Sequence, residues 1–193
     1  MSEETSDSSS PSPDKERARK PGKTIKLVVF AWFVLIFVGL MYFTTDRLVD
    51  FDPQATLLDN STEQTFYAEL DSFLKTHYES VQGRAFHISD DSCFCQMVAG
   101  AHIADVKKLV SNHTMENVSI ALSELPEMEK FLPSVPAVII YNDQSQLIYV
   151  GPYSTGYLCT TGNGLVEDLI PKMTQAVSDP VVMSLARGCY CNI

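Results

Sequence analysis

The chain has 193 residues, of which 45% are hydrophobic, and its formal net charge is −10. This length suits one domain with additional segments. A protein that binds nucleic acid presents a basic face to the phosphates, so the acidic balance argues against a nucleic-acid partner.

The N-terminal segment divides into a polar tail and one apolar run. Residues 1–26 are rich in Ser, Pro and charged side chains, which predicts a disordered tail. Residues 27–43 (LVVFAWFVLIFVGLMYF) contain no charge and no proline, and they have no polar face that a soluble helix would show. This run predicts a transmembrane helix near the short end of the usual length.

The charges that flank the apolar run predict its orientation. Basic residues next to a membrane span stay in the cytoplasm, and six precede this one: Lys15, Arg17, Arg19, Lys20, Lys23 and Lys26. A cleaved signal peptide is the alternative, but the following residues, MYFTTDRLVD, hold no small-x-small cleavage site. We expect an uncleaved single-pass anchor with everything after Phe43 outside the cytoplasm, where disulfides are stable.

The outer part of the chain alternates helical and strand patterns. Residues 44–58 predict a stalk, and a helix capped by Asn60 or Ser61 follows it to residue 78. Further along we expect strands over 84–89, 117–122, 135–142 and 146–153, and helices over 95–110, 123–132 and 163–177, with Pro171 breaking the last. The residues between the last two strands, NDQS, indicate a hairpin. This order predicts an α/β sandwich whose mixed sheet is flanked by helices.

A cysteine motif between the first strand and its helix makes the chain resemble the thioredoxin fold over residues 59–178. In that resemblance Cys93 of SDDSCFC takes the place of the nucleophilic cysteine, and Pro136 takes the place of the cis-proline that faces it. The pattern CFC, GPYS…C and GCYC is also similar to a bacterial family of single-span proteins with a thioredoxin-like domain of unknown function. The resemblance implies an inner-membrane protein with a periplasmic domain. Thioredoxins have C-x-x-C where this chain has C-x-C, and an acid where it has His87.

The C-x-C motif is open to three interpretations. With Cys93 as the nucleophile and Cys95 as the resolving thiol, the chain would be a thiol–disulfide oxidoreductase or isomerase that acts on protein thiols and is served by a membrane reductant. The positive end of a helix favours thiolate at this position, while Asp90 and Asp91 either oppose that effect or cap the helix. The second interpretation is a chaperone that holds Cu(I) or Zn(II) through thiolates. The third is a scaffold without chemistry.

Two histidines lie near the motif in the sequence. His87 is expected in the first strand, either as a hydrogen-bonded core residue or as the proton acceptor for the second cysteine. His102 lies seven residues after Cys95, about 10 Å along a helix, which is too far for both to hold one ion. We therefore expect His102 to pack or to hydrogen-bond against a neighbouring element. No cofactor is indicated, because the glycine-rich TGNG at 161–164 lacks the GK[ST] ending of a phosphate loop.

The odd number of cysteines, five, leaves at least one outside any intramolecular pair. We expect Cys93 and Cys95 to bond to each other. The C-terminal segment 179–193, which contains Cys189 and Cys191, is expected to fold back beside this pair. We expect one of its cysteines to bond to Cys159, on the loop that the resemblance places nearby, and the other to be left as a candidate relay.

Overall fold

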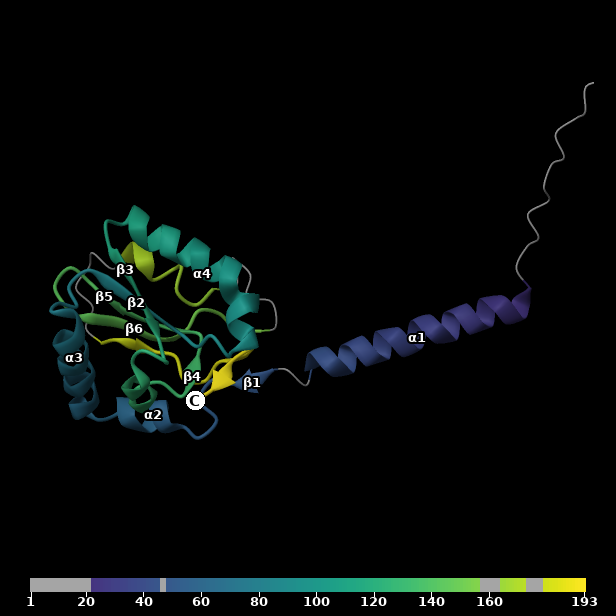
Figure 1. The fold of residues 1–193 in the computed structure, drawn as a ribbon, viewed down its shortest axis with the longest axis horizontal. Helices are drawn as coiled ribbons and strands as arrows, with labels where there is room; N and C mark the ends of the chain where they lie inside the picture. The colour runs from purple at the N-terminus through teal and green to yellow at the C-terminus, as the bar shows by residue number, and fades with distance from the viewer. Residues whose placement is uncertain (1–21, 46–47, 157–163, 173–178) are drawn as a thin grey trace, which may run out of the picture. The chain divides into compact units, whose positions relative to one another are not determined.

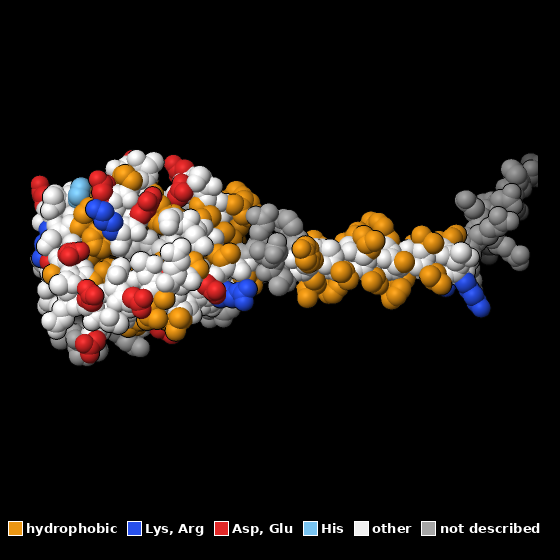
Figure 2. Space-filling view, turned by 90° about the horizontal axis from the view of Figure 1, so that it is seen from below, with side chains coloured by type: hydrophobic (Ala, Val, Ile, Leu, Met, Phe, Trp, Pro, Cys, Tyr) orange, Lys and Arg blue, Asp and Glu red, His pale blue; other side chains and the backbone are white. Residues whose placement is uncertain are grey.

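A computed structural model describes residues 22–45, 48–156, 164–172 and 179–193 (Figure 1). The chain divides into two compact units, residues 1–41 and residues 42–193. Helix α1 (Lys23–Thr45) begins four residues before the predicted span and contains all of it. Its apolar side chains are exposed, with Leu27, Phe33 and Leu35 between 61% and 72% accessible. Hydrophobic atoms cover the side of the helix seen in Figure 2. By length and composition, α1 can cross a membrane.

The second unit is built on a five-stranded mixed sheet in the order β3-β2-β5-β6-β7. Strands β2 and β3 are parallel, β5 is antiparallel to both β2 and β6, and β7 is parallel to β6. The strands span Arg84–Ser89 (β2), Glu116–Ala121 (β3), Ala137–Tyr141 (β5), Leu147–Pro152 (β6) and Val181–Val182 (β7). The predicted α/β class with a mixed sheet is thus confirmed, and so is the hairpin between β5 and β6.

Helices cover the two faces of this sheet (Figure 1). Helix α4 (Phe94–Asn112) packs its Ala99, Ile103 and Val106 against the face that carries Val138 and Ile140 of β5. Helices α2 (Thr56–Ser61) and α3 (Gln64–Tyr78) cover the opposite face with Leu57, Leu70 and Leu74. Alternate residues of a strand point to opposite faces, so two separate clusters form, one on each side of the sheet.

The segment predicted as a stalk, residues 44–58, is partly built into the domain. Strand β1 (Val49–Asp50) pairs with β8 (Arg187–Gly188), and Phe51 and Leu57 are 0% and 1% exposed. Residues 56–61 form a separate helix, so α3 starts at Gln64 with Glu63 at its N-cap position, and the expected cap at Asn60 or Ser61 is wrong. These contacts join segments more than a hundred residues apart, which a local reading of the sequence does not reveal.

Two expected helices are shorter than predicted. Residues 126–130 form a five-residue 3-10 helix rather than a helix over 123–132. Residues 164–169 form bends and turns, and a 3-10 helix follows at Ile170–Lys172, so the helix predicted over 163–177 is absent from residues 164–172. The remainder of that prediction, 173–177, lies outside the described residues.

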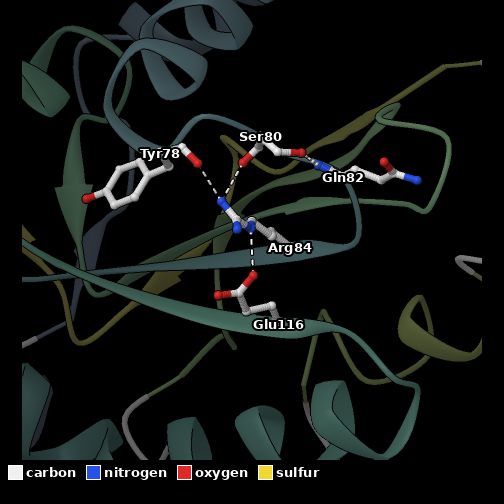
Figure 3. A network of polar contacts seen from close by, with 5 residues as sticks. All are labelled: Tyr78, Ser80, Gln82, Arg84 and Glu116. Atoms are coloured by element: carbon white, nitrogen blue, oxygen red, sulfur yellow. Dashed lines mark hydrogen bonds and ion pairs between the residues drawn. The ribbon is translucent and has the colours of Figure 1, made fainter.

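An arginine network holds the edge of the sheet at the start of β2 (Figure 3). Arg84 donates to the carbonyl oxygens of Tyr78 (2.6 Å) and Ser80 (2.8 Å) after α3, and its Nε donates to Glu116 on β3 at 2.7 Å. The network ties the C-terminal end of α3 to the first residues of β2 and β3. It therefore sits at the opposite end of β2 from Cys93.

Candidate functional site

A short turn joins β2 to α4 and carries the first C-x-C motif. Strand β2 ends at Ser89, and Asp90 folds the turn by accepting hydrogen bonds from Ser92 N at 2.9 Å and Ser92 Oγ at 2.7 Å. These bonds lower the pKa of the Asp90 carboxyl. Cys93 is the N-cap residue of α4 in an extended conformation, with no hydrogen bond from its side chain to the helix. Cys93 thus stands at the end of the helix where free backbone N–H groups and the helix dipole favour negative charge.

The two C-x-C motifs are joined by two disulfides. Cys93 is bonded to Cys191 and Cys95 is bonded to Cys189. The C-terminal segment is therefore folded back and held covalently beside the first motif, as expected. The expected pairing is wrong, because Cys93 is not bonded to Cys95 and neither tail cysteine is bonded to Cys159. Cys159 itself lies outside the described residues.

The motifs meet in antiparallel order, so the first cysteine of one motif faces the last of the other. Strand β9 (Cys191–Asn192) also pairs antiparallel with β4 (Ser134–Val135), with Cys191 opposite Val135. Cys93 Sγ lies 3.8 Å from Val135 O. The Val135–Pro136 peptide bond is cis, as the resemblance implied. The segment before Pro136 thus lies against both the helix cysteine and the tail cysteine.

Several noncovalent contacts also hold the tail in place. Tyr190 OH donates to Ser154 O at 2.5 Å, and its ring packs edge-on against Phe51 with centroids 5.2 Å apart. Ser134 Oγ lies 2.8 Å from Asn192 Oδ1, and Ile193 N donates to Pro133 O at 3.1 Å. The position of the tail does not depend on the disulfides alone.

Sulfur atoms are concentrated at this site and are largely shielded from solvent. The sulfurs of Cys93, Cys95 and Cys191 lie within 4.8 Å of one another. Cys93, Cys95 and Cys189 are buried, whereas Cys191 is half-buried. Cys191 is thus the most accessible of the four bonded cysteines.

Two apolar side chains in the first turn of α4 face solvent beside the disulfides. Phe94, between the two cysteines, is 56% exposed, and Met97 is 70% exposed. They are three residues apart and so are neighbours on the helix surface.

His87 is a buried residue with partners on both ring nitrogens. Nε2 lies 2.7 Å from Asn117 Oδ1, which can only accept, so Nε2 carries the proton and Nδ1 accepts from Tyr153 OH at 2.6 Å. Burial lowers the pKa of His87 to about 4, with a smaller contribution from Lys107, although the bond to Asn117 opposes the shift. His87 is therefore neutral at pH 7. Successive side chains of a strand point to opposite faces of the sheet. The preceding residue, Phe86, packs in the same cluster as Cys93 and Cys95, so the imidazole of His87 points to the opposite face from these cysteines.

His102 packs against a neighbouring element, as predicted. Its side chain is fully buried on α4, and Nε2 lies 2.5 Å from Glu167 Oε1. Its ring also packs edge-on against Tyr153, with centroids 6.3 Å apart. The histidine thus joins α4 to residues 164–172.

One sequence signal for the observed disulfide pairing was not used in the prediction. The two motifs have the same C-x-C spacing, so an antiparallel approach lets both cysteines of one motif bond to both of the other. Matched spacing therefore pointed to two bonds between the motifs rather than one bond within each.

The comparison with known families gives one match. The family described as "Domain of unknown function (DUF6436)" matches residues 62–193. The chain belongs to this family. The match covers the whole five-stranded sheet and both C-x-C motifs of this DUF6436 protein. The chain matches no curated protein and no solved structure.

Proposed function

We propose that this DUF6436 protein is a membrane-tethered thiol–disulfide exchange protein whose working groups are its two C-x-C motifs. The observation that carries the proposal is the cluster of Cys93, Cys95 and Cys191 sulfurs within 4.8 Å of one another at the start of α4. Sulfurs this close can exchange bonds with small side-chain motions. A structural staple would need only one bond.

The proposal includes a thioredoxin-like fold for the domain. Four features support it: the strand order β3-β2-β5-β6, the parallel β2–β3 pair, the cysteine motif between β2 and α4, and the cis-proline before β5. Pro136 acts in this proposal as a positioning residue, because it precedes β5 and directs Val135 toward the sulfurs.

Exchange begins at the most accessible sulfur. A thiolate of a partner protein attacks Cys191 Sγ, a new disulfide forms between the partner and Cys191, and the bond to Cys93 breaks. Cys93 leaves with the electron pair as a thiolate, which the N-terminal N–H groups of α4 stabilise. A second partner thiolate then attacks the partner sulfur of the mixed disulfide and releases Cys191. The partner loses two electrons as it becomes a disulfide, and the Cys93–Cys191 pair gains them.

The second disulfide extends this exchange into a relay. The Cys93 thiolate lies next to Cys95, so it can attack Cys95 and release Cys189 as a thiolate. His87 has no proton-transfer role in this scheme, because its ring nitrogens hold Tyr153 and Asn117. It stabilises the strand that ends at the reactive turn.

The proposal also covers location and partners. Helix α1 anchors the protein in the inner membrane, and the basic residues that precede it keep its N-terminus in the cytoplasm. The domain then lies in the periplasm, where proteins with thiols or disulfides are its partners. After a dithiol has been oxidised, an oxidant re-forms the Cys93–Cys191 disulfide, whereas a membrane reductant supplies the electrons when the exchange runs in the reducing direction. Phe94 and Met97 form an exposed apolar contact for such partners.

Two measurements test this function: the rate of turnover, and the identity of the sulfur that is attacked first. Full-length protein in detergent micelles is mixed with a dithiol peptide and glutathione disulfide, and formation of the cyclic peptide is followed. We expect catalysis that Cys93→Ser and Cys191→Ser abolish and that the matched control Cys159→Ser retains. Brief exposure to reduced glutathione, followed by alkylation, should place glutathione on Cys191 and the alkyl group on Cys93.

Two results would contradict the proposal in different ways. No turnover above the uncatalysed rate, with all four cysteines still bonded in a thiol buffer, would make the bonds permanent staples. Glutathione on Cys93 with alkylated Cys191 would reverse the direction of attack and leave exchange itself intact.

A further inference from the structure

The same four cysteines are a set of soft metal ligands when their bonds are open. Cys93, Cys95 and Cys191 already bring their sulfurs within 4.8 Å of one another, and Cys189 is bonded to Cys95. Four thiolates from two short motifs are a donor set that zinc binds in tetrahedral structural sites.

We propose that the reduced protein binds one zinc ion through Cys93, Cys95, Cys189 and Cys191. A Zn–S bond of about 2.3 Å in a tetrahedron separates the sulfurs by roughly 3.8 Å. Three of the four sulfurs already lie within 4.8 Å of one another, so small side-chain rotations complete the site. This inference goes beyond disulfide exchange and does not depend on turnover.

Contacts other than the disulfides keep the ligands together after reduction. Cys93 is the N-cap residue of a 19-residue helix, and Cys95 lies in its first turn. Cys189 follows β8, which is paired with β1, and Cys191 lies on β9, which is paired with β4. Tyr190, between the tail cysteines, is 6% exposed and donates to Ser154 O. The tail therefore stays beside α4 when its sulfurs are free.

The surroundings also suit the charge of the site. Four thiolates and Zn²⁺ carry a net charge of about −2, which the N-terminal N–H groups and dipole of α4 stabilise. In the turn, the carboxylate of Asp90 accepts from Ser92 N and Oγ. Cys191 is half-buried, which leaves a path for the ion to reach three buried ligands.

The reaction needs a reductant, and a dithiol supplies the electrons. Two dithiols become two disulfides, and the two protein disulfides become four thiols. Zinc then displaces the four thiol protons and binds the four sulfurs. An oxidant that restores the disulfides takes four electrons from the thiolates and releases the ion.

Cobalt(II) is the probe that reports directly on the ligands. Full-length protein in detergent micelles is reduced with a phosphine under nitrogen, freed of reductant, and titrated with Co(II) and then with Zn(II). We expect one Co(II) per chain with sulfur-to-cobalt charge transfer and the visible bands of a tetrahedral thiolate site, both erased by one equivalent of Zn(II). Native mass spectrometry of the reduced protein should show one zinc.

Two variants identify the ligands. Cys191→Ser should weaken Co(II) binding by at least the ~10–100-fold that loss of an outer-shell partner costs, and it should shift the bands to those of a three-sulfur site. Cys159→Ser should bind as the unchanged protein does. Comparing these two variants in the reduced state avoids any effect of disulfide loss on folding, because neither bond is present in either protein.

Three results would overturn the site: no thiolate bands in the reduced protein, bands that Cys191→Ser and Cys159→Ser affect equally, or disulfides that resist the phosphine while the protein is folded. The failure of dithiol oxidation in the turnover assay would leave the metal titration unaffected. The failure of metal binding would likewise leave the exchange proposal standing.

Discussion

Each disulfide of the site should contribute much less to stability when the other is present than when it stands alone. The Cys93–Cys191 bond spans 98 residues and the Cys95–Cys189 bond spans 94. In the chain-entropy model, closing a loop of either length stabilises by about 4.7 kcal/mol. When one bond is intact, the other closes only the loop formed by residues 93–95 and 189–191. This loop has about six residues, and closing it stabilises by roughly 2 kcal/mol.

A double-mutant cycle measures this redundancy. Four proteins are compared, all in a Cys159→Ala background so that no free thiol can exchange: the two-disulfide parent, Cys93→Ala/Cys191→Ala, Cys95→Ala/Cys189→Ala, and the quadruple variant. We expect each bond removed alone to lower the free energy of unfolding by about 2 kcal/mol and both together by about 7 kcal/mol. Each alanine pair also loses packing, which lowers the free energy of unfolding further. This loss cancels when the two single changes are subtracted from the double change to give the coupling energy.

The assay is urea unfolding of the full-length proteins in detergent, followed by far-ultraviolet circular dichroism. Tryptophan fluorescence is unsuitable because the single tryptophan, Trp32, lies in α1. A coupling energy of about 2–3 kcal/mol between the two disulfides would show that each one makes the other partly redundant. Losses that add to within about 0.5 kcal/mol, as for independent sites, would show that the two bonds constrain the unfolded chain separately.

Four further variants test the packing of the domain. The pKa of histidine is about 6.5 in the unfolded chain and that of buried His87 is about 4, so the unfolded state takes up a proton first as the pH falls. Stability should therefore fall by up to roughly 3 kcal/mol between about pH 6.5 and about pH 4. His87→Gln should remove that fall in pH-dependent unfolding. Gly188→Ala places a Cβ 2.7 Å from the Tyr190 ring, so we expect a loss of about 1–3 kcal/mol and faster reduction of the tail disulfides in thiol-trapping experiments. Arg84→Met should cost about 1–3 kcal/mol through two carbonyls left without their charged donor. Glu116→Gln, at a 60% exposed side chain, should cost less than about 1 kcal/mol in the same unfolding assay.

Elements with a strong local pattern were predictable from the sequence. Strand β2 has its predicted bounds, and α4, β3 and the β5–β6 hairpin lie within one or two residues of theirs. Their apolar spacing and their turns specify them without help from distant segments. The fold class follows from the order of these elements.

Features that depend on distant contacts were not predictable in the same way. Phe51 reads as part of a polar stalk, yet its N–H donates to Ala186 O and its side chain is fully buried. The prediction of the disulfide pairing was wrong for a related reason. Cys93 and Cys95 are neighbours in sequence, which favours a bond between them, but the return path of the C-terminal segment decides which sulfurs meet.

That return path links the redox state of the site to the position of the tail. In the proposed exchange the Cys93–Cys191 bond opens first, because Cys191 is half-buried, while Cys95–Cys189 connects two buried cysteines. In the proposed exchange, the Cys95–Cys189 bond still holds the tail after two electrons are taken up, until the relay moves the disulfide to Cys93–Cys95. Val135 stays covered through the pairing of β4 with β9. Transfer of the disulfide to Cys93–Cys95, or a four-electron reduction, removes the covalent link, and even then Tyr190 and the two small sheets oppose release. In this proposal the antiparallel crossing lets exchange begin at Cys191 while the Cys95–Cys189 bond still holds the tail.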